Sequence, residues 1–127
     1  MQVAHRAVAM MLRQRSRNRK TSHYMTPDQK KHVIYIDVDD TLIRTFGSKQ
    51  IPMPLSIEYV RRMSGAGHEL FCWSRGGGEY ARKIAISLGI DDCFTAFLPK
   101  PSVVFDDRGE KLLDHCEFVL PGNVSSY

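Results

Sequence analysis

Two aspartates separated by a single residue follow a run of β-forming residues and are the clearest chemical signal in the chain. Residues 33–36 read Val-Ile-Tyr-Ile, and Asp37, Asp39 and Asp40 come directly after them. A strand buried on both faces of a parallel sheet does not tolerate charge, so these carboxylates should lie at its carboxyl end, where open α/β sheets bind ligands. If the backbone stays extended, Asp37 and Asp39 can converge on one point, and their repulsion favours a divalent cation.

Two later apolar runs also end at functional groups. Residues 69–73 end at Ser74, and residues 102–105 end at Asp106 and Asp107. A further run, residues 94–98, is followed by Pro99-Lys100-Pro101, so Lys100 lies just before the last run. Each group alone has an ordinary explanation: a helix cap for the serine, a solvated loop position for the lysine, and an Asx turn for the acid pair. The four motifs in one order are what indicate a common site.

In this order the motifs resemble those of the haloacid dehalogenase-like superfamily of phosphotransferases. The family pattern is Asp-x-Asp-x-Thr, a strand ending in Ser or Thr, a Lys, and a strand ending in paired acids. The corresponding residues here are Asp37-Val38-Asp39-Asp40-Thr41, Ser74, Lys100 and Asp106-Asp107, within a resemblance that covers about residues 32–120. Receiver domains of two-component signalling use similar groups in a different order. One departure from the family is Asp40, where Gly is frequent.

The resemblance implies a phosphomonoester hydrolase that works through an aspartyl phosphate. Asp37 is then the nucleophile, and Asp39 protonates the leaving oxygen and later deprotonates the attacking water. Ser74 and Lys100 hold the phosphoryl oxygens, with Lys100 also screening charge near Asp37. Thr41 is expected to brace the loop and not to touch substrate.

The resemblance also implies a magnesium ion and a substrate contact. Family precedent has Mg²⁺ held by the Asp37 carboxylate, the backbone carbonyl of Asp39 and Asp106, with Asp107 acting directly or through water. Hard oxygen ligands of this kind suit Mg²⁺ and not zinc. Arg75 either contacts the substrate phosphate or leaving group, or is an ordinary exposed arginine.

Short apolar runs that alternate with helical spacing predict an α/β fold with a parallel sheet and helices on both faces. The expected elements are strand 33–37, a loop through Pro54, helix 55–65, strand 69–73, helix 78–89, strand 94–98, strand 103–106, helix 109–115 and strand 117–120. The resemblance implies a three-layer Rossmann-like sheet of order 3-2-1-4-5 with the Asp37 strand in the centre. The intervals between Thr41, Ser74 and Lys100 are too short for the family's cap domain, so the chain resembles a capless member.

A capless site is open to solvent. Water exclusion must then come from the loop at 43–54, from a partner subunit in a homo-oligomer, or from the substrate itself. The phosphorylated substrate can be a small molecule, a phosphoprotein or a nucleic-acid end, and the sequence does not name it. The rival hypothesis is a non-catalytic or regulatory binding protein that keeps the fold while a basic arm contacts nucleic acid.

Charge separates a basic N-terminal extension, residues 1–31, from the expected catalytic domain, residues 32–127. The chain carries a net charge of +4, of which residues 1–32 contribute +7 and residues 33–127 contribute −3. Three interpretations of the extension stay open: a solvated extension or an early start with Met25 as the alternative, a polyanion-binding arm, or an organelle transit peptide, since residues 1–24 contain no acid.

Cysteine usage and hydropathy predict a cytoplasmic protein that does not enter membranes. The three cysteines show no Cys-x-x-Cys spacing, and two of them, Cys72 and Cys93, lie in or beside apolar runs while Cys116 is the third. Buried free thiols in a reducing compartment are the expected state. No apolar stretch reaches the length of a membrane span.

Overall fold

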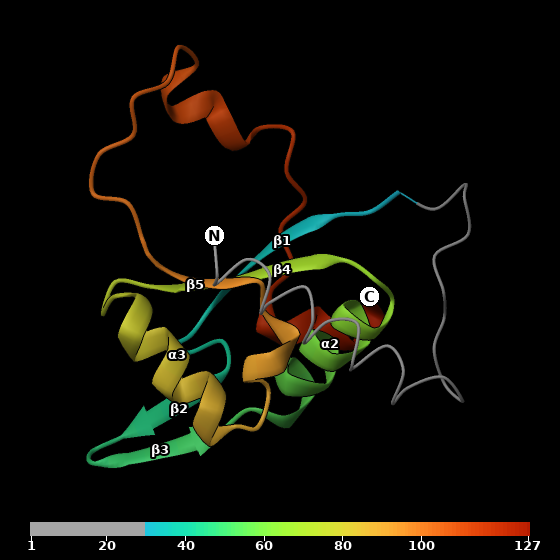
Figure 1. The fold of residues 1–127 in the computed structure, drawn as a ribbon, viewed down its shortest axis with the longest axis vertical. Helices are drawn as coiled ribbons and strands as arrows, with labels where there is room; N and C mark the ends of the chain where they lie inside the picture. Colours follow the sequence, from blue (N-terminus) through green and yellow to red (C-terminus); the bar gives the residue numbers. More distant parts are fainter. Residues whose placement is uncertain (1–29) are drawn as a thin grey trace.

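The computed structural model describes residues 30–127 (Figure 1), and nearly all of the basic extension lies outside them. The strands are β1 (Val33–Asp37), β2 (Ile43–Phe46), β3 (Lys49–Pro52), β4 (Glu69–Ser74) and β5 (Ala96–Pro99). The helices are α2 (Pro54–Gly65), α3 (Gly78–Ser87) and the 3₁₀ helices η1 (Asp91–Cys93), η2 (Gly109–Leu113) and η3 (Pro121–Ser126). Within this part of the chain no helix is long and apolar enough to cross a bilayer.

Strands β1, β4 and β5 form one parallel sheet, which confirms the α/β class. Their order is β1-β4-β5, with Asp37 opposite Trp73 and Ser74 opposite Pro99. Strands of this kind need crossover connections, and α2 and α3 provide them. The parallel register brings the carboxyl ends of all three strands to one edge, so residues that are far apart in sequence meet there.

The core lies on one face of this sheet. Alternate residues of the central strand, Leu70 and Cys72, are fully buried, and Ile36 of β1 lies on the same face. Val60 of α2 and Ala81 of α3 belong to the same buried cluster. Both α-helices therefore cover the same face, and the expected arrangement with helices on both faces is wrong.

The opposite face carries an uncovered aromatic cluster. The rings of Tyr35 and Trp73 meet edge to face with centroids 4.8 Å apart, and Tyr35 and Phe71 are 5.2 Å apart. Tyr35 is 48% exposed, and Val33 beside it is 61% exposed. No helix among residues 30–127 packs on these side chains, so this part of the chain forms two layers, one of strands and one of helices, in place of the expected three.

The expected five-stranded sheet is also wrong, because the predicted strands 103–106 and 117–120 do not form. Residues 101–120 leave the sheet and arch away from it before η3 returns to α2 (Figure 1). Val103 is 83% exposed and Phe105 is fully exposed. A run of β-forming residues becomes a strand only where it finds a partner and cover. The helix predicted at 109–115 is the short 3₁₀ helix η2.

A hairpin replaces the loop that was expected before Pro54. Strands β2 and β3 pair antiparallel, with Phe46 opposite Lys49 across a two-residue turn. Gly47 has a φ of +60°, which a two-residue turn requires and which glycine adopts without strain. The Gly-Ser dipeptide between β-forming residues was the signal that could have predicted it. The interval from Thr41 to Ser74 thus holds a hairpin, α2 and β4, without a separate cap domain.

Candidate active site

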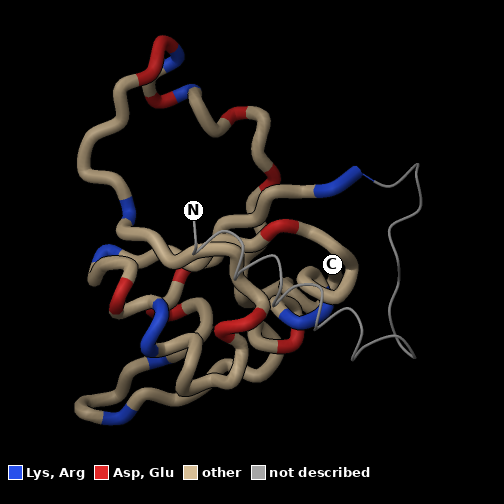
Figure 2. The backbone as a smooth tube through the Cα atoms, viewed as in Figure 1, with Lys and Arg blue, Asp and Glu red and all other residues tan. Residues whose placement is uncertain are grey.

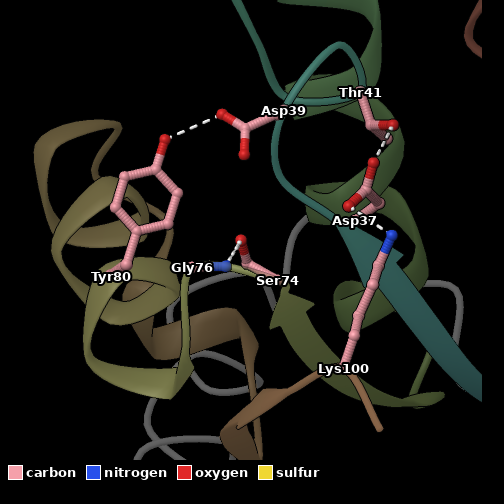
Figure 3. A network of polar contacts seen from close by, with 7 residues as sticks. All are labelled: Asp37, Asp39, Thr41, Ser74, Gly76, Tyr80 and Lys100. Atoms are coloured by element: carbon pink, nitrogen blue, oxygen red, sulfur yellow. Dashed lines mark hydrogen bonds and ion pairs between the residues drawn. The ribbon is translucent and has the colours of Figure 1, made fainter. Parts of the chain in front are cut away.

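Asp37, the last residue of β1, has an ordered partner on each carboxylate oxygen (Figure 3). Lys100 Nζ lies 2.9 Å from Oδ1, and the Thr41 hydroxyl donates to Oδ2 at 3.0 Å. The Asp37 and Lys100 side chains are each about one third exposed, at 33% and 31%. The carboxylate is therefore oriented by two contacts while solvent, or a ligand, can still reach it.

Lys100 is held at this position by the backbone. Its N–H donates to the carbonyl oxygen of Ser74 at 2.9 Å, directly after the last paired position of β4 and β5. Its ammonium group also lies 5.9 Å from the centroid of the Trp73 ring, within cation–π range. These contacts fix the stem and the charge together, which argues against a freely solvated loop lysine.

A tight turn after β1 brings Thr41 back towards Asp37. The carbonyl oxygen of Val38 accepts the N–H groups of Thr41 at 3.2 Å and Leu42 at 2.8 Å. Asp40 within the turn has a φ of +59°, in the left-handed region that favours Gly and tolerates Asp. This conformation explains how an aspartate can occupy a position where members of the haloacid dehalogenase-like superfamily often have glycine. The predicted bracing by Thr41 acts on the Asp37 carboxylate itself.

Asp39 turns away from Asp37 and contacts helix α3. Its Oδ1 accepts a hydrogen bond from the Tyr80 hydroxyl at 2.7 Å (Figure 3). Burial and this hydrogen bond raise the pKa of Tyr80 to about 12, so the phenol stays protonated and keeps donating at neutral pH. The two carboxylates lie at the same edge, but they engage different partners and do not converge on one point.

Ser74 is buried at the end of β4, with 1% of its surface exposed. Its Oγ accepts the N–H of Gly76 at 3.0 Å, and its carbonyl oxygen accepts the N–H of Gly77 at 3.1 Å. Gly77, with a φ of +103°, is the residue that precedes α3, so Ser74 closes the turn before the helix and does not cap it. Arg75, the candidate substrate contact, is exposed.

Asp106 and Asp107 are not brought to Asp37. Both are exposed on the segment 101–120, which carries more acidic than basic residues (Figure 2). Asp106 Oδ1 accepts the N–H of Arg108 at 2.8 Å, which is the Asx turn that the dipeptide alone suggested. Their assignment as metal ligands stays a prediction.

The predicted magnesium ligands do not fit such a site in this arrangement. The Asp37 carboxylate is paired with Lys100 and Thr41, and Asp106 is exposed on the segment 101–120, which leaves the sheet. Across residues 30–127, three or more His, Cys, Asp or Glu side chains do not gather as a metal-binding group.

A shallow apolar hollow lies elsewhere, between the hairpin and the start of α2. Its volume is about 340 Å³. The lining residues are Arg44, Phe46, Ile51, Pro52, Met53, Pro54, Leu55, Ser56 and Pro121. It contains none of the predicted site residues.

Sequence reasoning missed Tyr80. A tyrosine in the first turn of a helix carries no motif, and its contact with Asp39 joins α3 to the turn after β1, which are 41 residues apart in sequence. Comparison with known proteins adds no further residue: no family model, curated protein or solved structure matches the chain. The inference of function therefore rests on the geometry at the carboxyl edge of the sheet.

Proposed function

We propose that the chain is a phosphomonoester hydrolase in which Asp37 is the nucleophile. The ion pair of Asp37 with Lys100 carries the proposal. A lysine held at 2.9 Å from a partly exposed carboxylate reduces the repulsion that this carboxylate would meet from a phosphate dianion. Asp39 and Ser74, from two different strand ends, lie at the same edge.

The reaction divides into two transfers of the phosphoryl group. Asp37 forms a bond to phosphorus while the bond from phosphorus to the ester oxygen breaks, and Asp39 gives that oxygen a proton. A water molecule then forms a bond to phosphorus while the bond from phosphorus to the Asp37 oxygen breaks. Asp39 takes a proton from this water, and inorganic phosphate leaves the regenerated Asp37 carboxylate. Lys100 and the Ser74 hydroxyl stabilise negative charge on the phosphoryl oxygens in both steps.

Hydrolysis of p-nitrophenyl phosphate tests the proposal. We expect turnover by the wild-type chain and its loss in Asp37→Asn, without a change in the circular dichroism spectrum. Asp40→Asn is the matched control, because it removes a carboxylate from the same turn and asparagine also tolerates a positive φ. Full activity of Asp37→Asn would refute the mechanism. Assays with Mg²⁺ and with EDTA test the predicted magnesium dependence separately.

A second candidate function is favoured by the exposure of Asp106 and Asp107 on the segment 101–120, which arches away from the sheet (Figure 1). It is a non-catalytic or regulatory binding protein whose basic extension contacts nucleic acid. Electrophoretic mobility shifts across a salt series test it, because binding through clustered Lys and Arg weakens steeply as salt rises. Binding that disappears when residues 1–24 are deleted would support this function, whereas no shift at low salt would exclude it.

A further inference from the structure

We propose that Tyr80 is a positioning residue for Asp39: its hydroxyl fixes Oδ1 of the carboxylate and leaves Oδ2 to exchange the proton with the leaving oxygen and the attacking water. This role rests on the proposed function. It adds a residue that no motif of the chain includes, and it gives the first turn of α3 a part in the chemistry.

The contact has normal hydrogen-bond geometry and comes from a helix. The Tyr80 hydroxyl donates to Asp39 Oδ1 at 2.7 Å, the usual distance for a hydroxyl donor. Asp39 is itself exposed, so without this contact its side chain would be free to change rotamer in solvent. One hydrogen bond from a helix therefore selects one orientation of the carboxylate.

Glycines at the start of α3 set the position of the Tyr80 ring. A Cβ at Gly76 would lie 2.8 Å from Cδ1 of the ring, so only glycine allows the ring to pack against this part of the turn. A Cβ at Gly78 would lie 2.6 Å from the carbonyl oxygen of Phe97, so α3 begins in direct contact with β5. The position of the ring is thus set by the same turn that holds Ser74.

The protonation state of Tyr80 suits a donor and not a base. Its pKa is raised to about 12 by burial and by the bond to Asp39. The hydroxyl therefore stays protonated through the pH range of an ordinary assay and exchanges no proton with the substrate. Its effect on the reaction must pass through Asp39, which makes the effect depend on how much the leaving oxygen needs a proton.

Leaving-group dependence distinguishes this role from a structural one. p-Nitrophenolate leaves readily without a proton, whereas phenolate depends more on a general acid. The aspartyl phosphate is the same for both substrates, so the comparison uses kcat/KM, which reports the steps up to loss of the leaving group. In Tyr80→Phe, which removes only the hydroxyl, we expect kcat/KM for phenyl phosphate to fall about tenfold, as loss of one hydrogen bond to a carboxylate predicts. We expect kcat/KM for p-nitrophenyl phosphate to fall less than about twofold. Tyr59→Phe on α2 is the matched control and should leave both rates unchanged.

A double-mutant cycle completes the test. If Tyr80 acts through Asp39, Tyr80→Phe should have no further effect on phenyl phosphate in an Asp39→Asn background. Equal loss of kcat/KM for both substrates, no loss, or a full additional loss in that background would overturn the role of Tyr80 while the proposed function stands. Absence of wild-type turnover on both phosphates, or full activity of Asp37→Asn, would instead overturn the proposed function and this role with it.

Discussion

Replacement of Lys100 by methionine separates the catalytic use of the ion pair from its structural use. The variant keeps most of the apolar stem and removes the charge 2.9 Å from Asp37 Oδ1. It also keeps the backbone N–H that donates to Ser74, since that contact does not depend on the side chain. Any change should therefore come from the lost ammonium group.

The expected loss of stability is small. Two unit charges about 3 Å apart interact by about 1.4 kcal/mol in water and by about 5.5 kcal/mol at an effective dielectric constant of 20. Both side chains are about one third exposed, so solvent screening and side-chain entropy reduce the net value to that of a surface pair, about 0–1 kcal/mol. Lys100→Met should lower the free energy of unfolding by no more than about 1 kcal/mol.

The expected loss of activity is much larger. Negative charge moves onto the phosphoryl oxygens in the transition state, and loss of one preorganised donor to such charge costs on the order of 10²-fold in rate. We therefore expect kcat/KM for p-nitrophenyl phosphate to fall about 100-fold in Lys100→Met. Lys83→Met, an exposed position on α3, is the control for loss of one positive charge and should leave kcat/KM unchanged.

Two results would refute this reasoning. If Lys100→Met keeps kcat/KM within about threefold of wild type, Lys100 does not stabilise transferring charge. If urea unfolding shows a loss of about 3 kcal/mol or more, the pair is a structural element and the activity measurement no longer reports on catalysis. The Lys100→Arg variant adds a check, because it restores the charge with a different donor geometry.

Three further predictions concern packing, pH and thiol reactivity. Gly78→Ala should lower the free energy of unfolding in urea by about 1–3 kcal/mol, because its Cβ would meet the Phe97 carbonyl oxygen; unchanged stability would contradict the close packing. Burial and then the charge of His32 lower the pKa of His68, so the folded state binds fewer protons and stability should fall as pH drops below about 6.5. His68→Asn should lose part of that pH dependence in urea titrations, and an identical slope would argue against it. At pH 7.5 a maleimide should label Cys116 alone, with the two buried thiols reacting only in urea; labelling of all three in the folded chain would contradict their burial.

The placement of side chains at the strand ends could be predicted because it depends on local sequence. Asp37 follows an apolar run and Ser74 follows another, and the parallel pairing of β1 with β4 places both at one edge. The position of Lys100 near Asp37 was expected only from the family resemblance. In the structure Pro99 pairs with Ser74 and the lysine comes next, which brings its ammonium group to Asp37.

The predictions that were wrong or missing concern contacts between elements that are distant in sequence, which sequence patterns do not specify. Val103 and Phe105 have the composition of a strand, yet they pair with nothing among residues 30–127 and stay exposed. The apolar composition of the face around Tyr35 and Trp73 predicts a buried sheet surface, although no helix among residues 30–127 covers it. Tyr80 could not be found because its contact with Asp39 joins two elements whose spacing is set by packing alone.

Detection of the covalent intermediate tests the central claim most directly. The wild-type chain is mixed with p-nitrophenyl phosphate, quenched in acid during turnover, digested and examined by mass spectrometry. We predict one added phosphoryl group on the peptide that contains Asp37, lost on addition of hydroxylamine and absent from Asp37→Asn. Turnover with no phosphorylated peptide, or with the phosphoryl group on Asp39, would contradict the assignment of Asp37 as the nucleophile.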